Sequence, residues 1–128
     1  ASNYGRVKDY AHLNAKELCL LLQVETLQGL ENLEAIANVD GVDGVFIGPG
    51  DLSAALGHLG NPKHPEVLKV IDDAIARIKA CGKAPGILTG DEALAKHYVA
   101  QGCLFVAVGA DQNVLRDSAT ALAQRFKS

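Results

Sequence analysis

The clearest signal for the fold is the segment Gly44-Val45-Phe46-Ile47-Gly48-Pro49-Gly50-Asp51-Leu52-Ser53. A short apolar run ends in a Gly-Pro-Gly turn, which is typical of a buried strand followed by a tight connection. Asp51 is thereby predicted at the carboxyl end of the strand, the edge where parallel α/β sheets hold their ligands. If a short helix begins at this turn, its free backbone N–H groups form an anion site, and Gly50 lets a carboxylate approach closely.

A second apolar run, Leu18–Val24, precedes this stretch and is followed by polar residues. Its continuous apolar character predicts another buried strand. Side chains alternate along a strand, so Gln23 and Glu25 share one face. Glu25 and Asp51 then stand at the same rim, where two carboxylates can hold a divalent ion such as Mg²⁺, with water and substrate in the remaining positions. From spacing alone, it is equally reasonable that Glu25 forms a salt bridge and that Asp51 caps a helix.

Two more apolar runs, Ala84–Leu88 and Leu104–Val108, complete four predicted strands. The intervening and following segments have helical patterns, at residues 27–36, 65–82, 91–102 and 112–126. Residues 1–16 are more polar and are predicted to form a loop followed by a helix. This alternating order predicts an α/β fold, in which a parallel sheet carries helices packed outside it.

The size and composition of the chain bound its class. The 128 residues are predicted to form one domain spanning 1–128, and 48% hydrophobic with 21% charged residues is typical of a globular protein. A net charge of −3 argues against a nucleic-acid or anionic-membrane surface. No apolar run approaches the roughly 18 residues that span a bilayer, and no secretory signal is recognisable. We therefore expect a cytoplasmic protein, with Cys19, Cys81 and Cys103 reduced and buried.

The number of strands is half of what a closed barrel requires. A barrel of eight strand–helix units typically needs about 250 residues. A free half barrel would leave the edges of Leu18–Val24 and Leu104–Val108 unpaired, which favours association. The pattern is compatible with a fragment, a split subunit or an independent flavodoxin-like sheet, and periodicity alone does not choose among them.

Several segments resemble the metal-dependent (class II) pyruvate aldolases that cleave 2-dehydro-3-deoxyglucarate or 4-hydroxy-2-oxoheptanedioate. These segments are 23–26, 41–61, 64–67, 86–88 and 105–111. The resemblance covers essentially the whole chain but only about the second half of that family's barrel. It implies that the parallel βα units form the C-terminal half of a TIM (β/α)₈ barrel and that the N-terminal half is absent from this chain.

The resemblance also implies roles for individual residues. Glu25 and Asp51 match the metal ligands, with Mg²⁺ as the expected ion and Mn²⁺ or Co²⁺ as alternatives. The backbone at Gly50, where the family usually has Ala or Ser, matches the receptor for the substrate carboxylate. The implied substrate contacts are Gln23, Phe46, Gly50, Asp51 and Leu88. Core packing explains the two apolar members of that set almost as well.

The implied activity is cleavage of a 4-hydroxy-2-oxo acid, such as 2-dehydro-3-deoxyglucarate, to pyruvate and an aldehyde. The family's catalytic histidine and oxyanion-stabilising arginine come from the first half of the barrel, so we expect no catalytic residue in this chain. The implied partners are the missing half, a small 2-oxo acid and further copies of the chain, since hexamers are common in the family. A CoA-ester lyase of related fold and a non-catalytic half-barrel module for assembly or ligand binding are the alternatives.

Histidine and lysine positions bear on the mechanism. The four histidines are His12, His58, His64 and His97. No pair of them has metal-ligand spacing in the sequence, so we expect surface or loop roles. A Schiff-base aldolase would need a lysine at a strand's carboxyl end, but Lys83 precedes its strand and the other candidates fall within helices. The lysine positions therefore disfavour a Schiff-base mechanism.

Overall fold

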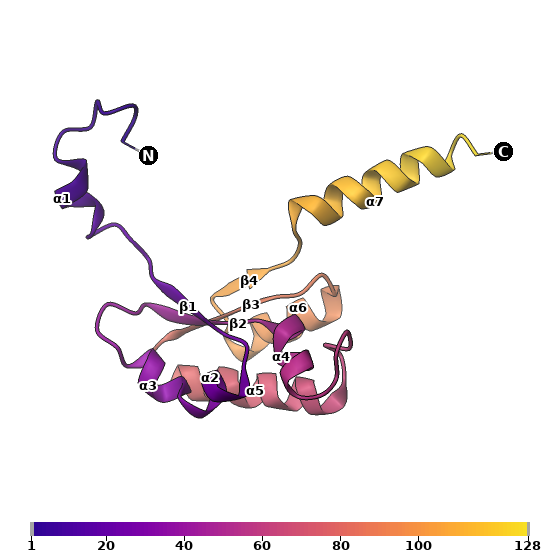
Figure 1. The fold of residues 1–128 in the computed structure, drawn as a ribbon, viewed down its shortest axis with the longest axis horizontal. Coiled ribbons are helices and arrows are strands. Elements are labelled where there is room, and N and C mark those ends of the chain that lie inside the picture. The colour runs from indigo at the N-terminus through magenta and orange to yellow at the C-terminus, as the bar shows by residue number, and fades with distance from the viewer. Residues whose placement is uncertain (1, 128) are drawn as a thin grey trace.

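The computed structural model describes residues 2–127, which contain one four-stranded parallel sheet (Figure 1). The strands are β1 (Leu21–Val24), β2 (Gly44–Ile47), β3 (Ala84–Leu88) and β4 (Phe105–Ala107), and they lie side by side in chain order. Val24 is paired with Ile47, and Ile47 with Ile87, so the carboxyl ends of β1, β2 and β3 meet at one edge. The predicted α/β fold with parallel strand–helix units is confirmed.

Seven helices accompany the sheet within the described residues. They are α1 (Tyr10–Asn14), α2 (Leu27–Glu31), α3 (Leu33–Ala37), α4 (Pro49–Ala55), α5 (Pro65–Ala80), α6 (Glu92–Gln101) and α7 (Asp111–Gln124). Helices α2 to α6 lie on one side of the sheet, whereas α1 and α7 extend away from it near the two ends of the chain (Figure 1). No helix in residues 2–127 is both long and apolar enough to cross a bilayer.

The residues at the ends of helices α5 and α6 explain why these helices begin and end where the sequence predicts. Pro65 is the first residue of α5, where its fixed φ and missing N–H suit a helix start. Gly82 follows that helix with φ +71°, a left-handed conformation that favours glycine. Asp91 caps α6 by accepting a hydrogen bond from the Leu94 N–H at 3.0 Å, and left-handed Gly102 ends it. These four boundary predictions are confirmed.

Alternate strand residues point toward the helices and form the core. Val45, Ile47 and Ile87 are fully buried together with Ile71 and Ile78 of α5. We call this side of the sheet the covered face. Burying each such aliphatic side chain contributes roughly 1.5–3 kcal/mol. The covered face therefore supplies the main stabilising contacts of the chain.

The opposite side of the sheet, which we call the open face, carries Gln23, Phe46, Gly86, Leu88 and Phe105. Leu88 is 41% exposed and Phe105 is 51% exposed. The rings of Phe46 and Phe105 meet with centroids 5.5 Å apart, and a Cβ on Gly86 would lie 2.8 Å from Phe46 Cδ2. Glycine at position 86 thus lets the two rings close over β3, but the face has no covering layer within residues 2–127.

Several predictions about individual elements are wrong. The first strand begins at Leu21 rather than Leu18, since the Leu20 N–H donates to the Asp43 carboxylate at 2.7 Å instead of to a neighbouring strand. The expected helix over 27–36 is two short helices, α2 and α3. Asn32 separates them, and its side chain donates to the Gln28 carbonyl at 2.8 Å, a local bond that competes with regular helix.

The cysteines and the last helix also depart from expectation. All three cysteines are free, but only Cys103 is buried; Cys81 is partly exposed and Cys19, which precedes the edge strand β1, is exposed. Burial raises the pKa of the Cys103 thiol above its usual value. Helix α7 forms close to its predicted range, yet its apolar residues, including Leu115 and Leu122, are exposed because the helix extends away from the rest of residues 2–127.

Candidate metal and substrate site

The two predicted metal ligands lie at the same rim of the sheet. Glu25 directly follows β1, and Asp51 occupies the first turn of α4, which starts immediately after β2 and Gly48. Strands β1 and β2 are neighbouring and parallel, so the segments that leave their carboxyl ends begin side by side. The fold thus gives both carboxylates the placement that the strand pattern predicts.

Glu25 is held against the turn that leads to Asp51. The Gln23 side-chain amide donates a hydrogen bond to Glu25 Oε2, which agrees with the prediction that these two residues share a face. A Cβ on Gly48 would lie 2.6 Å from Glu25 Oε2 and 2.8 Å from Gln23 Nε2. Any side chain at position 48 would therefore displace both polar groups, and glycine there leaves room for them.

The alternative roles for the two carboxylates find no support in the described residues. Within residues 2–127, neither Glu25 nor Asp51 forms an ion pair with a basic side chain inside 4.0 Å. The residue at the N-cap of α4 is Gly48, and no side chain caps that helix end. Glu25 accepts the hydrogen bond from Gln23 and Asp51 is exposed to solvent, so neither carboxylate is engaged by a basic side chain of the described residues.

Gly50 lies in an open position at the start of α4. It is exposed, and a Cβ built on it would meet nothing within 4 Å, so an alanine or serine would also fit. Buried Ser53 donates its hydroxyl to the Gly50 carbonyl at 2.6 Å and fixes this turn. The Leu52 N–H donates to the Gly48 carbonyl at 3.0 Å, whereas the N–H groups of Gly50 and Asp51 belong to the first turn, where helical acceptors are lacking.

A cavity of about 520 Å³ adjoins this turn. The side chains and backbone around it include Pro49, Gly50, Lys63, Leu88, Asp91 and Tyr98. The Lys63 ammonium donates to Asp91 Oδ2 at 2.5 Å, and this hydrogen bond lowers the pKa of the Asp91 carboxyl. Burial raises the pKa of Tyr98 to about 12, so its hydroxyl stays protonated. The cavity brings together Gly50 and Leu88 from the predicted substrate set.

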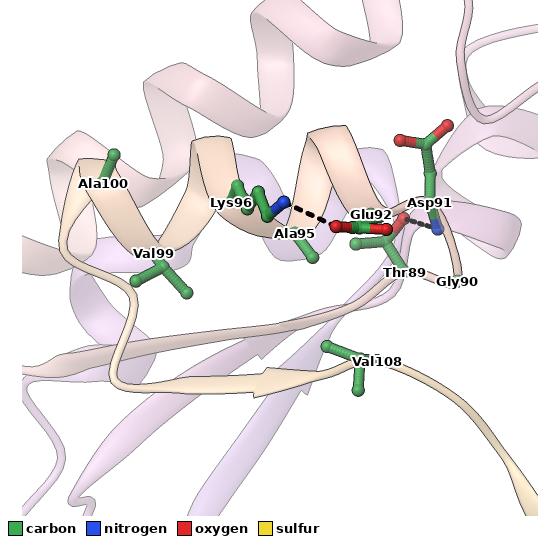
Figure 2. A pocket seen from close by; sticks show the side chains of 9 residues that line it. All are labelled: Thr89, Gly90, Asp91, Glu92, Ala95, Lys96, Val99, Ala100 and Val108. Atoms are coloured by element: carbon green, nitrogen blue, oxygen red, sulfur yellow. Dashed lines mark hydrogen bonds and ion pairs between the residues drawn. The ribbon is translucent and has the colours of Figure 1, made fainter.

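A second cavity, of about 510 Å³, lies between α6 and the segment after β4 (Figure 2). Its apolar surface comes from Ala95, Val99 and Val108, and Lys96 pairs with Glu92 at 2.5 Å beside it. None of the predicted substrate or metal residues lines this cavity. Its apolar character is that of a groove for packing rather than of a site for a charged substrate.

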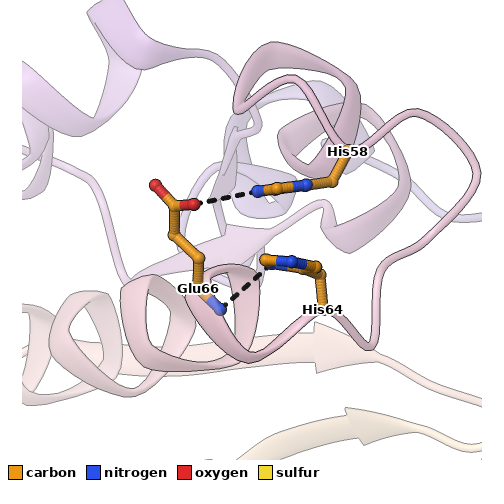
Figure 3. A group of neighbouring side chains, drawn as sticks. All are labelled: His58, His64 and Glu66. Carbon is orange, nitrogen blue, oxygen red and sulfur yellow. Dashed lines mark hydrogen bonds and ion pairs between the residues drawn. The ribbon is translucent and has the colours of Figure 1, made fainter.

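Two histidines are brought together despite their separation in the sequence. Figure 3 shows His58 and His64 stacked, with ring centroids 3.5 Å apart, and His58 Nε2 lies 2.9 Å from Glu66 Oε2. The hydrogen bond from His58 lowers the pKa of Glu66. The predicted loop position of His58 is confirmed, but spacing in the sequence does not predict its proximity to His64. The loop between α4 and α5 closes the five-residue gap, and no helical or strand periodicity signals such a closure.

The fold and the rim define a class of protein: parallel strand–helix units with acidic residues at the carboxyl ends of neighbouring strands. Residues 3–118 match the family model described as HpcH/HpaI aldolase/citrate lyase. The chain belongs to this family, and the predicted resemblance is confirmed.

Individual relatives agree with the family match. The chain is 58% identical to the hydroxypyruvate/pyruvate aldolase of Pseudomonas aeruginosa, over 99% of this chain and 47% of that protein. It is 57% identical to the 4-hydroxy-2-oxo-heptane-1,7-dioate aldolase of Klebsiella pneumoniae, over 98% of this chain and 48% of that protein. The crystal structure of a family member from Burkholderia cenocepacia superposes with a TM-score of 0.83 at 37% identity, covering 99% of this chain and 50% of that one.

The chain spans about half the length of the curated relatives it matches. Together with the four parallel strands, this agrees with the prediction that its βα units are the C-terminal half of a barrel. The open face is then the side that points into the barrel, and the covered face is the side that carries the outer helices.

Proposed function

We propose that this chain supplies the metal and carboxylate site of a divalent-metal-dependent aldolase that cleaves a 4-hydroxy-2-oxo acid to pyruvate and an aldehyde. The observation that carries the proposal is the placement of Glu25 and Asp51 at the ends of adjacent parallel strands, with Glu25 seated against Gly48. Relatives that are more than half identical are named as aldolases of hydroxypyruvate and pyruvate or of 4-hydroxy-2-oxo-heptane-1,7-dioate. Substrates of the 2-dehydro-3-deoxyglucarate type belong to the same chemical class.

The donor set at the rim fits a hard divalent cation. Glu25 and Asp51 offer carboxylate oxygens, the ligands that Mg²⁺ prefers, and two protein ligands leave positions for a chelating 2-oxo acid. Mn²⁺ and Co²⁺ are the alternative ions. When bound there, the ion supplies Lewis acidity toward the charge that develops on the 2-oxo oxygen as the C3–C4 bond breaks.

The other residues of the site bind and orient the substrate. In this proposal the N–H groups of Gly50 and Asp51 receive the substrate carboxylate, and the Gln23 amide, which already donates to Glu25, positions the reacting end. Phe46 and Leu88 form apolar walls beside it. No group of this chain is assigned the role of base, so the proton of the 4-hydroxyl passes to a residue supplied by further barrel units.

The proposal includes partners for the surfaces that this chain leaves uncovered. Four further βα units, covering the open face and pairing with β1 and β4, would close the barrel and bring a histidine base and an arginine to the rim. Helix α7, whose apolar residues are exposed, would pack on a neighbouring copy within a homo-oligomer, a hexamer in our proposal. Three free cysteines and a small metabolic substrate favour the cytoplasm as the compartment.

The proposal is tested with a barrel completed by the upstream half of the Pseudomonas aeruginosa relative. Pyruvate release from 4-hydroxy-2-oxo-heptane-1,7-dioate is followed through lactate dehydrogenase with Mg²⁺ and without CoA. Turnover is expected for the wild-type sequence and should be lost in Asp51→Asn but kept in Asp111→Asn, which alters an acid in the first turn of α7 instead. Turnover that requires a CoA ester would identify the related lyase, and equal turnover in both variants would refute the assigned metal site.

A further inference from the structure

The cluster of His58, His64 and Glu66 lies on segments that the proposed aldolase chemistry does not use. His58 sits in the loop after α4, His64 is the N-cap of α5, and Glu66 is in the first turn of that helix (Figure 3). One ligand atom from each of the three side chains lies within 4.8 Å of the others. The cluster therefore brings two imidazole nitrogens and a carboxylate oxygen close to one another.

The backbone holds this loop in place. The His58 N–H donates to the Ser53 carbonyl at 2.7 Å, the Asn61 N–H donates to the His58 carbonyl at 2.9 Å, and the His64 N–H donates to the Asn61 carbonyl at 3.1 Å. Gly60 adopts φ +76°, a conformation that makes the tight return possible. The two imidazoles are thus attached to a hydrogen-bonded loop, and much of the entropy cost of bringing them together is met by folding.

We propose that His58, His64 and Glu66 bind one borderline transition-metal ion such as Zn²⁺. Two imidazoles and a carboxylate form a recognised ligand set for zinc, with the fourth position left to water. This donor set differs in kind from the two carboxylates at the rim, because imidazole nitrogen favours zinc over magnesium. The chain would then carry two cation sites that differ in chemical preference.

The three ligand atoms need to move only modestly to surround a zinc ion. With zinc bonds of about 2.0–2.2 Å, ligand atoms around a tetrahedral ion are roughly 3.3–3.5 Å apart. The His58 Nε2 to Glu66 Oε2 distance is 2.9 Å, and the whole set spans no more than 4.8 Å. The rings are stacked at 16° to each other, so side-chain rotation must tilt them until their nitrogen lone pairs converge. The side chain of Glu66 is 59% exposed, so it can move with the imidazole rings as they tilt.

Binding has a consequence for the neighbouring cavity. Pro62 and Lys63, which line the 520 Å³ cavity beside Gly50, lie on the short segment between the two histidines. An ion bound to His58, His64 and Glu66 would fasten both ends of this segment to the start of α5. We expect the ion to restrain the wall of that cavity, whichever substrate the cavity accepts.

The test is a zinc titration of the chain by isothermal calorimetry, with folding of each variant checked by circular dichroism. The titration is run in excess Mg²⁺ so that the rim site is occupied, and one Zn²⁺ per chain is then expected to bind. His58→Ala and Glu66→Gln should each weaken binding about 10-fold or more, since each removes a ligand. His64→Asn should weaken it similarly while keeping a side chain that can cap α5.

Two control variants separate this site from general metal affinity. His97→Ala removes a histidine that also pairs with an acid, Asp72 at 3.1 Å, but has no second imidazole beside it. Asp111→Asn removes an acid in the first turn of α7, outside both proposed sites. Both controls should bind zinc as the wild type does. Failure of the folded wild-type chain to bind zinc, or binding that His58→Ala leaves unchanged, would overturn the proposal, whereas the aldolase proposal would stand in either case.

Discussion

The two faces of one sheet differ sharply, although the same strands form both. On the covered face, Val45, Ile47 and Ile87 are fully buried under helices that the chain itself provides. On the open face, their neighbours Leu88 and Phe105 are 41% and 51% exposed. The stability of this chain therefore rests on one side of the sheet, whereas the side that would surround a substrate has no second layer within residues 2–127.

The rim joins these two faces. Glu25 and Asp51 are positioned by strands whose order depends on the covered face, but a substrate bound at the rim would also contact Phe46 and Leu88 of the open face. We therefore expect changes to the covered face to affect folding, and changes to the open face or the rim to affect ligands and assembly.

The largest expected effect comes from covering the open face. The 128-residue chain alone should associate through its exposed strand edges and show little aldolase turnover, whereas addition of the relative's upstream half should restore turnover. A positioned general base contributes about 10²–10⁴-fold to rate, and an oxyanion donor about 10²–10³-fold. Pyruvate release and light scattering measure the two outcomes. A monodisperse chain that turns over as fast as the completed barrel would place the base within these residues.

A pair of truncations compares the two faces directly. Ile71→Ala on the covered side should lower the free energy of unfolding by about 2–5 kcal/mol, because it opens a cavity in a packed core. Phe105→Ala on the open side should cost much less, since its ring is half exposed and loses mainly its contact with Phe46. Urea denaturation followed by circular dichroism gives both values. Equal losses would mean that the open face is covered by association between copies of the chain.

At the rim, Asp51→Asn should weaken binding of Mn²⁺, used as a probe for Mg²⁺, by about 10-fold or more, because a charged ligand becomes neutral. Asp111→Asn, in the first turn of α7, is the matched control and should leave the titration unchanged. Secondary structure should be preserved in both variants. Unchanged Mn²⁺ affinity in a folded Asp51→Asn protein would remove Asp51 from the metal site.

Structural features that depend on residues close together in the sequence are the ones that the sequence predicts. The shared face of Gln23 and Glu25, and the boundary residues Asp91 and Gly102, are set within a few positions, so the sequence predicts them correctly. The fold and the rim placement of the candidate site follow from such signals. The exposure of Cys19 and the break at Asn32 depend on edge position and on a side-chain bond that compete with the simple periodicity.

The histidine cluster illustrates the limit for sites. His58 and Glu66 are eight residues apart, and only the path of the loop between α4 and α5 brings them within 2.9 Å. Positive φ values at Gly57 and Gly60 shape that path, but glycines in a loop are compatible with many paths. Residue spacing therefore predicts ligands on strands and helices much better than ligands on a loop.

The smallest predicted effect concerns an ion pair on the outer surface of the covered side. Arg77 of α5 donates to both carboxylate oxygens of Glu34 in α3, at 2.6 and 2.7 Å, and these hydrogen bonds lower the pKa of Glu34 to about 2. A carboxyl whose pKa is lower in the folded state stabilises the fold above its unfolded pKa, and this contribution is lost as pH falls toward the folded value. In Glu34→Gln, the decline of the urea midpoint between pH 4.5 and 2 should therefore be shallower than in the wild type, with Glu31→Gln as the control in the neighbouring helix α2. The difference should be small because the pair is exposed to solvent. If the two variants follow the same pH curve, the ionised Glu34–Arg77 pair makes no measurable contribution to the link between α3 and α5.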